Sequence, residues 1–169
     1  MTGSIYLLDG DGHLEPMSEQ SYDSERLLQE LLAKYPDLLA GEQMNPDSPR
    51  RWLLIRREAG IPDAESAGNR WAVDHLFLDQ DAIPTLVEVK RGADTRIRRE
   101  VVGQMLDYAA NAVVHWPVER IRAEFETACE GSGVSAEERL LEFLDDESDE
   151  DVFWSDVKTN LRAGRVRMV

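Results

Sequence analysis

The sequence predicts an α/β domain in which a helix, three consecutive strands, a second helix and a late strand follow one another. Apolar residues recur at three- and four-residue spacing in segments 24–39 and 94–112, which is typical of amphipathic helices. Apolar and β-branched runs in segments 52–55, 70–79 and 85–91 predict strands. The 169 residues, 42% of them hydrophobic, suit one compact α/β or α+β domain with a substantial core.

The elements of the N-terminal half are marked by turn and cap residues. Residues 4–17 predict a small peripheral hairpin, because its Asp-Gly pairs at positions 9–12 supply the positive φ of a tight turn. Asp23 or Ser24 can cap the first helix, over 24–39. A loop at 46–49 and a turn-rich connection at 60–68 then separate the strands, and three strands in sequence favour an antiparallel meander.

The C-terminal half is predicted to be mainly helical. The second helix, 94–112, ends before Trp116-Pro117, and further helices are expected at 118–129, 136–144 and 151–161. The acidic run 145–151 predicts a solvated loop. Residues 165–169 alternate like a strand and the chain stops directly after them, so we expect a fragment of a longer protein.

Composition restricts the function. The net charge of −15 argues against a protein that simply coats nucleic acid. However, residues 119–156 hold 14 acids and 3 arginines, whereas residues 50–104 hold 10 basic and 9 acidic residues. The sequence has no membrane-length apolar run and no signal peptide, so we expect a cytoplasmic protein without a membrane partner. The lone Cys129 excludes a disulfide framework and a cysteine-based zinc site.

Two neighbouring strands bring charged residues together. Alternation places Glu88 and Lys90 on one face of their strand, while Val87 and Val89 point into the core. Asp74 lies on the preceding strand. A buried charge is costly unless it is compensated, and a divalent cation is the simplest partner for two carboxylates. The alternative is a surface ion pair between Glu88 and Lys90 on an edge strand.

This pattern resembles the PD-(D/E)XK phosphodiesterase superfamily, and within it the NucS-like and RecB-like branches or an uncharacterised relative. The resemblance rests on Asp74 followed by Glu88-Val89-Lys90, and on Gln104 with Tyr108 one turn later. Glu25 matches a glutamate that many members carry on the helix before the sheet. The match covers residues 24–112 and departs from the family where Val73, rather than proline, precedes Asp74.

The resemblance implies a restriction-endonuclease-like core, with a central mixed sheet and helices on both faces. Residues 1–118 would then form the hairpin and the nuclease-like core, and residues 119–169 an acidic helical segment ending in a late strand of the same domain. It also implies a metal-dependent nuclease acting on DNA more than on RNA. The expected catalytic residues are Glu25, Asp74, Glu88, Lys90 and Gln104. Mg²⁺ or Mn²⁺, which stabilises phosphoryl charge and activates water, would be held by Asp74, Glu88 and the carbonyl of Val89.

Nucleic acid would be contacted by basic residues beside the site and by one tyrosine, namely Arg91, Arg96, Arg98, Arg99 and Tyr108. The arginines could equally form a solvated face, and Glu25 could serve only the helix dipole. The rival function is a catalytically inactive module of the same fold that binds nucleic acid or a protein partner. A homodimer is compatible with either function, because one small acidic domain offers limited grip on a duplex.

Overall fold

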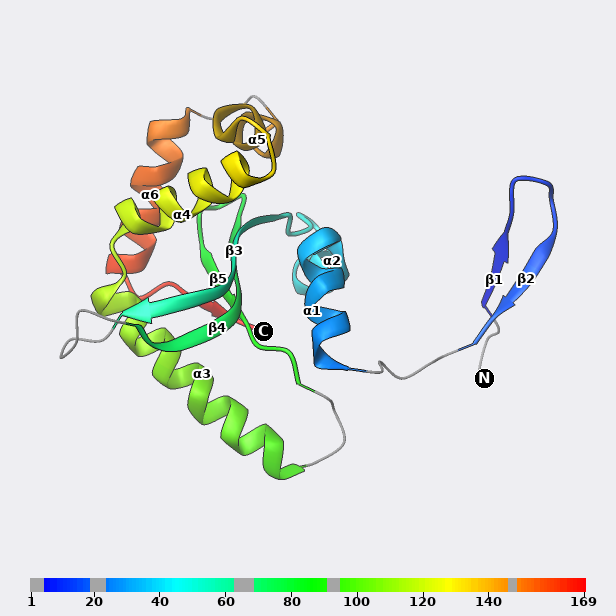
Figure 1. The fold of residues 1–169 in the computed structure, drawn as a ribbon, viewed down its shortest axis with the longest axis horizontal. Coiled ribbons are helices and arrows are strands. Elements are labelled where there is room, and N and C mark those ends of the chain that lie inside the picture. Colours follow the sequence, from blue (N-terminus) through cyan, green and yellow to red (C-terminus); the bar gives the residue numbers. More distant parts are fainter. Residues whose placement is uncertain (1–4, 19–23, 63–68, 91–94, 146–148) are drawn as a thin grey trace.

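The computed structural model describes residues 5–18, 24–62, 69–90, 95–145 and 149–169. Its centre is a four-stranded mixed sheet with strand order β3-β4-β5-β6 (Figure 1). β3 (Trp52–Pro62), β4 (Asn69–Asp79) and β5 (Pro84–Val87) form the predicted antiparallel meander, and β6 (Arg167–Met168) joins β5 in parallel. The expectation of an α/β protein with a mixed central sheet is therefore confirmed.

Helices cover both faces of this sheet. α1 (Glu25–Lys34) and the 3-10 helix η1 (Pro36–Leu39) pack on one face, where Leu32 and Leu39 meet Phe77 and Val87. The other face packs against the four helices α3 (Thr95–His115), α4 (Val118–Gly131), α5 (Ala136–Phe143) and α6 (Glu150–Arg162). Strand alternation explains this division, because Leu76 points to the second face and its neighbour Phe77 to the first.

Several boundaries differ from the sequence prediction. The first helix ends at Lys34 rather than at residue 39, because Tyr35 precedes Pro36 and leaves the helical region at φ −131° and ψ 76°. Ser24 caps its start, accepting a hydrogen bond from the backbone N–H of Leu27 at 3.2 Å. β3 extends to Pro62, beyond the apolar run, and its pairing with β4 contains an irregularity at Leu54–Arg56. The short helix α2 (Gly41–Met44) was not predicted.

The described part of the acidic run makes defined contacts, while residues 146–148 lie outside the described residues. Asp149 is the N-cap of α6, and its carboxylate accepts hydrogen bonds from the backbone N–H groups of Asp151 and Val152. Asp145 pairs with Arg51, and Glu150 accepts a hydrogen bond from Arg122 at 2.8 Å. The helix therefore begins at Glu150, inside the segment 145–151 predicted as a loop and one residue before the predicted helix start.

A buried carboxylate fastens the late strand to the sheet. The side chain of Asp79 is fully buried and accepts a hydrogen bond from Arg167 on β6 at 2.7 Å. Arg167 also donates to the hydroxyl of Thr85 at 3.2 Å and lies over the ring of Trp52. This network explains why a two-residue strand docks beside β5 in a fixed register.

The predicted hairpin is present and lies apart from the sheet in Figure 1. β1 (Ile5–Leu8) pairs antiparallel with β2 (Leu14–Met17), and every residue of both strands is exposed. The turn between them is held by the carboxylate of Asp9, which accepts hydrogen bonds from the backbone N–H groups of Asp11 and His13. Within the described residues, no helix has the length and apolarity needed to cross a membrane.

Candidate functional site

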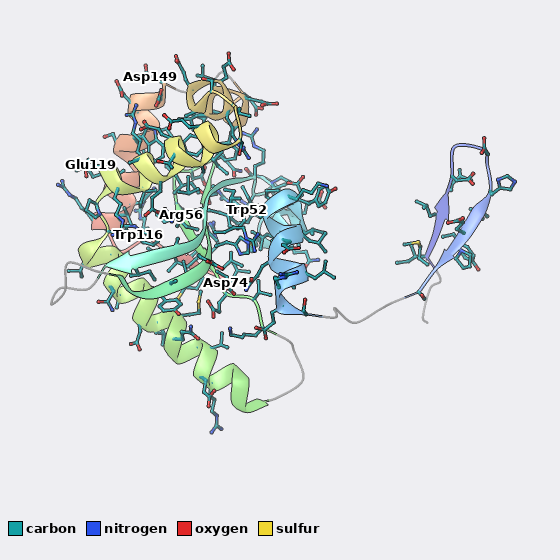
Figure 2. All side chains as sticks on the ribbon, viewed as in Figure 1. Trp52, Arg56, Asp74, Trp116, Glu119 and Asp149 are labelled. Carbon is teal, nitrogen blue, oxygen red and sulfur yellow. The ribbon has the colours of Figure 1, made fainter. Side chains whose placement is uncertain are left out.

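The sheet register brings the two expected carboxylates together. β4 and β5 pair His75 with Val87, so one step further along the same register Asp74 stands opposite Glu88. The backbone N–H of Val89 donates to Asp74 Oδ2 at 2.7 Å, and Asp74 is labelled in Figure 2. The N–H of Glu88 donates to the carbonyl of Val169 at 3.1 Å. The C-terminal residue therefore helps to hold Glu88 in place, although β5 itself ends at Val87 rather than at the expected residue 91.

Glu88 carries a deeply buried charge in this site. Its side chain is only 3% exposed. Oε1 lies 2.9 Å from the ammonium of Lys90 and accepts a hydrogen bond from the amide of Gln104 at 3.2 Å. Oε2 is buried and has no hydrogen-bond partner among the residues that the structure describes. An unsatisfied carboxylate oxygen in a buried position is costly, so this atom is a natural point of attachment for a cation or a proton donor.

Lys90 links the carboxylates to α1. Its Nζ lies 3.8 Å from Glu25 Oε2, and one third of the Lys90 side chain is exposed. Burial alone would lower the pKa of Lys90, but the hydrogen bond with Glu88 and the charges of Glu88, Asp74 and Glu25 outweigh it and raise the pKa. Lys90 is therefore held as an ammonium ion at neutral pH.

α3 contributes Gln104 and Tyr108 from successive turns. The amide of Gln104 donates both to Glu88 Oε1 and to the hydroxyl of Tyr108. Tyr108 is 3% exposed, and its pKa is raised by burial and by the charges of Glu88 and Asp74, despite the Gln104 hydrogen bond and the charge of Lys90. Tyr108 therefore positions Gln104 from within the core rather than presenting its ring to solvent.

His75 lies on the opposite face of β4 from Asp74, as alternation predicts. Its Nε2 is 2.8 Å from the carbonyl of Gln29 on α1, and its ring stacks on Phe77. Burial is the largest influence on His75 and lowers its pKa, with a smaller contribution from the charge of Arg57, against the Gln29 hydrogen bond and the charge of Asp74. His75 is thus a neutral core residue that ties α1 to the sheet.

The expected nucleic-acid contacts are only partly described. Arg91 and the side chains of Arg96 and Arg98 lie outside the described residues. Arg99 is exposed, and helical geometry separates it from Gln104 by about 140° around α3. Its role in binding nucleic acid therefore stays a prediction, and it points away from the side of α3 that carries Gln104.

The oxygen atoms of Asp74 and Glu88 are the candidate ligands for a metal ion at this site. Among the described residues, no three His, Cys, Asp or Glu side chains form a ready-made metal cage. Asp74 and Glu88 nevertheless converge, and the unpartnered Oε2 of Glu88 is a suitable oxygen ligand. Oxygen ligands that leave room for several waters suit Mg²⁺, which keeps part of its hydration shell when it binds proteins. The carboxylates present therefore fit such an ion, and the Val89 carbonyl is the further ligand that the resemblance implies.

Val169 contributes to this site, which the sequence did not predict. Val169 pairs through its carbonyl with Glu88 and through its N–H with the carbonyl of Leu86. The alternation of residues 165–169 signalled a strand, but not its neighbour in the sheet.

Comparison with known proteins adds no constraint, since no family model, curated protein or solved structure matches this chain.

Proposed function

We propose that this protein is a phosphodiesterase that uses Mg²⁺ or Mn²⁺ to hydrolyse the backbone of DNA. The observation that supports the proposal is the convergence of Asp74, Glu88 and Lys90 beside a buried Glu88 oxygen that has no hydrogen-bond partner in the described part of the chain. An ordinary surface ion pair would leave the second oxygen of its carboxylate hydrated. Here the Glu88–Lys90 pair lies beside a second carboxylate, that of Asp74. The carboxylates of Asp74 and Glu88 both face α3, on the same side of the sheet.

Asp74, Glu88 and the Val89 carbonyl would hold the ion. When bound, a divalent cation stabilises charge on the phosphoryl oxygens and makes a coordinated water more acidic. The chain itself fixes the geometry of the carboxylates: Val89 N–H orients Asp74, and Gln104 orients Glu88. Such support from neighbouring hydrogen bonds is what keeps metal ligands in place.

Lys90 acts in this proposal as a positive charge rather than as a base. Its raised pKa keeps the ammonium protonated, so it is suited to stabilise the negative charge that develops on phosphate. Glu25, 3.8 Å away, restrains the ammonium from the start of α1. On the side of the site formed by α3, the hydrogen bond to the Tyr108 hydroxyl holds the amide of Gln104 in place.

The test is incubation of the protein with single-stranded, double-stranded and branched DNA, and with RNA, in Mg²⁺, Mn²⁺ or EDTA. We expect metal-dependent cleavage of DNA that Glu88→Gln reduces by at least about 100-fold, since this change removes one ligand charge. Glu100→Gln, an exposed position on α3, is the matched control and should cut like the wild type. A wild-type protein that cleaves no substrate with any divalent ion, or a Glu88→Gln protein of normal activity, would overturn the proposal.

A second candidate, a binding module without catalysis, is favoured by one contact. Lys90 already neutralises one oxygen of Glu88 at 2.9 Å, as an internal cation would. If wild type and Glu88→Gln bind DNA equally and neither cleaves it, the module becomes the better explanation.

A further inference from the structure

One face of the N-terminal hairpin is apolar and exposed. Cross-strand register pairs Tyr6 with Pro16 and Leu8 with Leu14, so these four side chains share one face, which we call the hairpin face. All four are exposed, and Leu8 is 63% exposed. An isolated two-stranded hairpin is marginally stable in water. The hairpin face therefore gains stability from any apolar layer that covers it.

A second apolar surface runs along the outside of α3. Val102, Leu106, Ala110 and Val114 recur every fourth residue, are all exposed, and form what we call the α3 stripe. Leu106 is 55% exposed and lies two residues from both Gln104 and Tyr108, which places it on the opposite side of the helix. The inner side of α3 thus carries the candidate site, and its outer side is left free for a contact.

The C-terminal end of the stripe opens into a recess. Val113 and Val114 line a cavity of about 310 Å³, and its lining is partly apolar and partly charged: Trp116, Pro117, Val118, Leu161, Glu119, Lys158 and Arg162. The stripe therefore ends at a recess of mixed lining, which has room for a side chain from a covering layer.

The hairpin as a whole and the start of α3 carry opposite charges. The hairpin contains Asp9, Asp11 and Glu15 and no lysine or arginine. Arg99 is exposed seven residues before Leu106, almost in line with the α3 stripe. Acidic charge on the hairpin also argues against nucleic acid as its partner.

We propose that two copies of this chain associate by exchanging hairpins, the hairpin face of each copy covering the α3 stripe of the other. One chain carries both halves of the contact, and Figure 1 places the hairpin apart from its own α3. Exchange of an element between copies is a low-cost route to a symmetric dimer. A stable interface buries about 800 Å² per partner, and exchange forms the contact twice in each dimer.

The oligomeric state tests the proposal without any measurement of activity. Wild type, Leu8→Glu and Leu106→Glu would be compared by sedimentation velocity over a range of concentrations, with circular dichroism to verify folding. We expect a wild-type dimer and at least about 100-fold weaker association in each variant, because each change places a charge in both symmetric contacts. Val134→Glu, at an exposed apolar residue before α5, is the control and should remain dimeric.

Mixing the two variants distinguishes exchange from other arrangements. The Leu106→Glu copy keeps a normal hairpin and the Leu8→Glu copy a normal stripe, so the mixture regains one of its two contacts. We therefore expect heterodimers at concentrations where each variant alone is monomeric. A wild-type monomer at every concentration, a variant that alone dimerises as strongly as wild type, or a mixture that stays monomeric at those concentrations would each overturn the proposal. A dimer of Leu8→Glu alone would indicate contact between stripes, and one of Leu106→Glu alone contact between hairpins.

Discussion

Replacing Lys90 by methionine separates a metal site from an ordinary ion pair. The change keeps the length of the aliphatic chain and removes the ammonium that lies 2.9 Å from Glu88 Oε1. Among the described residues, the buried carboxylate of Glu88 then keeps the Gln104 amide as its hydrogen-bond donor. Asp74 lies nearby and carries the same negative charge, so loss of the Lys90 ammonium leaves two neighbouring carboxylates to repel each other.

The size of the effect follows from the burial of the two partners. Removing one partner of a fully buried pair costs roughly 3–5 kcal/mol, whereas an exposed pair contributes only about 0–1 kcal/mol. Glu88 is 3% exposed and Lys90 is 33% exposed, which places this pair between the two cases. We expect Lys90→Met to lower the free energy of unfolding by about 1–3 kcal/mol in EDTA.

A divalent cation should restore this loss. A ligand that binds only the folded state stabilises it by about 2.7 kcal/mol at a concentration of 100 times its Kd. Because the competing ammonium is gone, Mn²⁺ should stabilise Lys90→Met more than wild type. In the double variant Glu88→Gln/Lys90→Met the carboxylate is absent, so both the cost in EDTA and the response to Mn²⁺ should largely disappear.

The assay is urea unfolding in EDTA and across a Mn²⁺ titration. Lys158→Met is the matched control, since Lys158 lies 3.1 Å from Glu119 in a pair that is exposed on both sides. Its cost should stay below about 1 kcal/mol, with no added response to metal. If Mn²⁺ stabilises Lys90→Met no more than wild type, or stabilises Glu88→Gln equally well, the carboxylates do not form a cation site.

Two further predictions concern stability. Arg167→Met should lower the free energy of unfolding, measured by urea titration, by roughly 2–4 kcal/mol, because it deprives the fully buried Asp79 of its closest cation. A loss no larger than that caused by Arg165→Met, at an exposed position, would contradict this. The lowered pKa of His75 means that the unfolded chain binds its proton first, near the ordinary value of 6.5, so stability falls as the pH drops below that value. His75→Gln should reduce this slope by up to about 1.4 kcal/mol per pH unit between pH 7 and 5, and equal slopes would exclude His75 as the cause.

The order of elements was predictable from the sequence because it depends on local patterns. Alternation and turn residues indicated the hairpin, the meander and the late strand, and helical spacing indicated α1 and α3. Boundaries were less accurate where a tertiary contact decides them. The extended segment after Val87, for example, is held by Val169 from the far end of the chain.

The candidate site was predictable in its membership but not in its internal contacts. Alternation placed Glu88 with Lys90, and the register of β4 and β5 then brings Asp74 beside them. No local pattern indicates that Lys90 binds one oxygen of Glu88 while the other is buried with no partner among the described residues. That asymmetry depends on the packing of α3, whose Gln104 closes the site from outside the sheet.

Packing also changes how strongly the acidic segment, residues 119–156, would repel a polyanion. By composition, residues 119–156 would repel any polyanion. In the fold, several of these acids are paired, as Glu126 and Glu150 are with Arg122. Exposed charges more than about 8–10 Å apart are largely screened at physiological salt. In Figure 1, α5 and the start of α6 lie at the end of the molecule away from the start of α3. A DNA backbone approaching between the starts of α1 and α3 would therefore meet Lys90 before it meets this acidic layer.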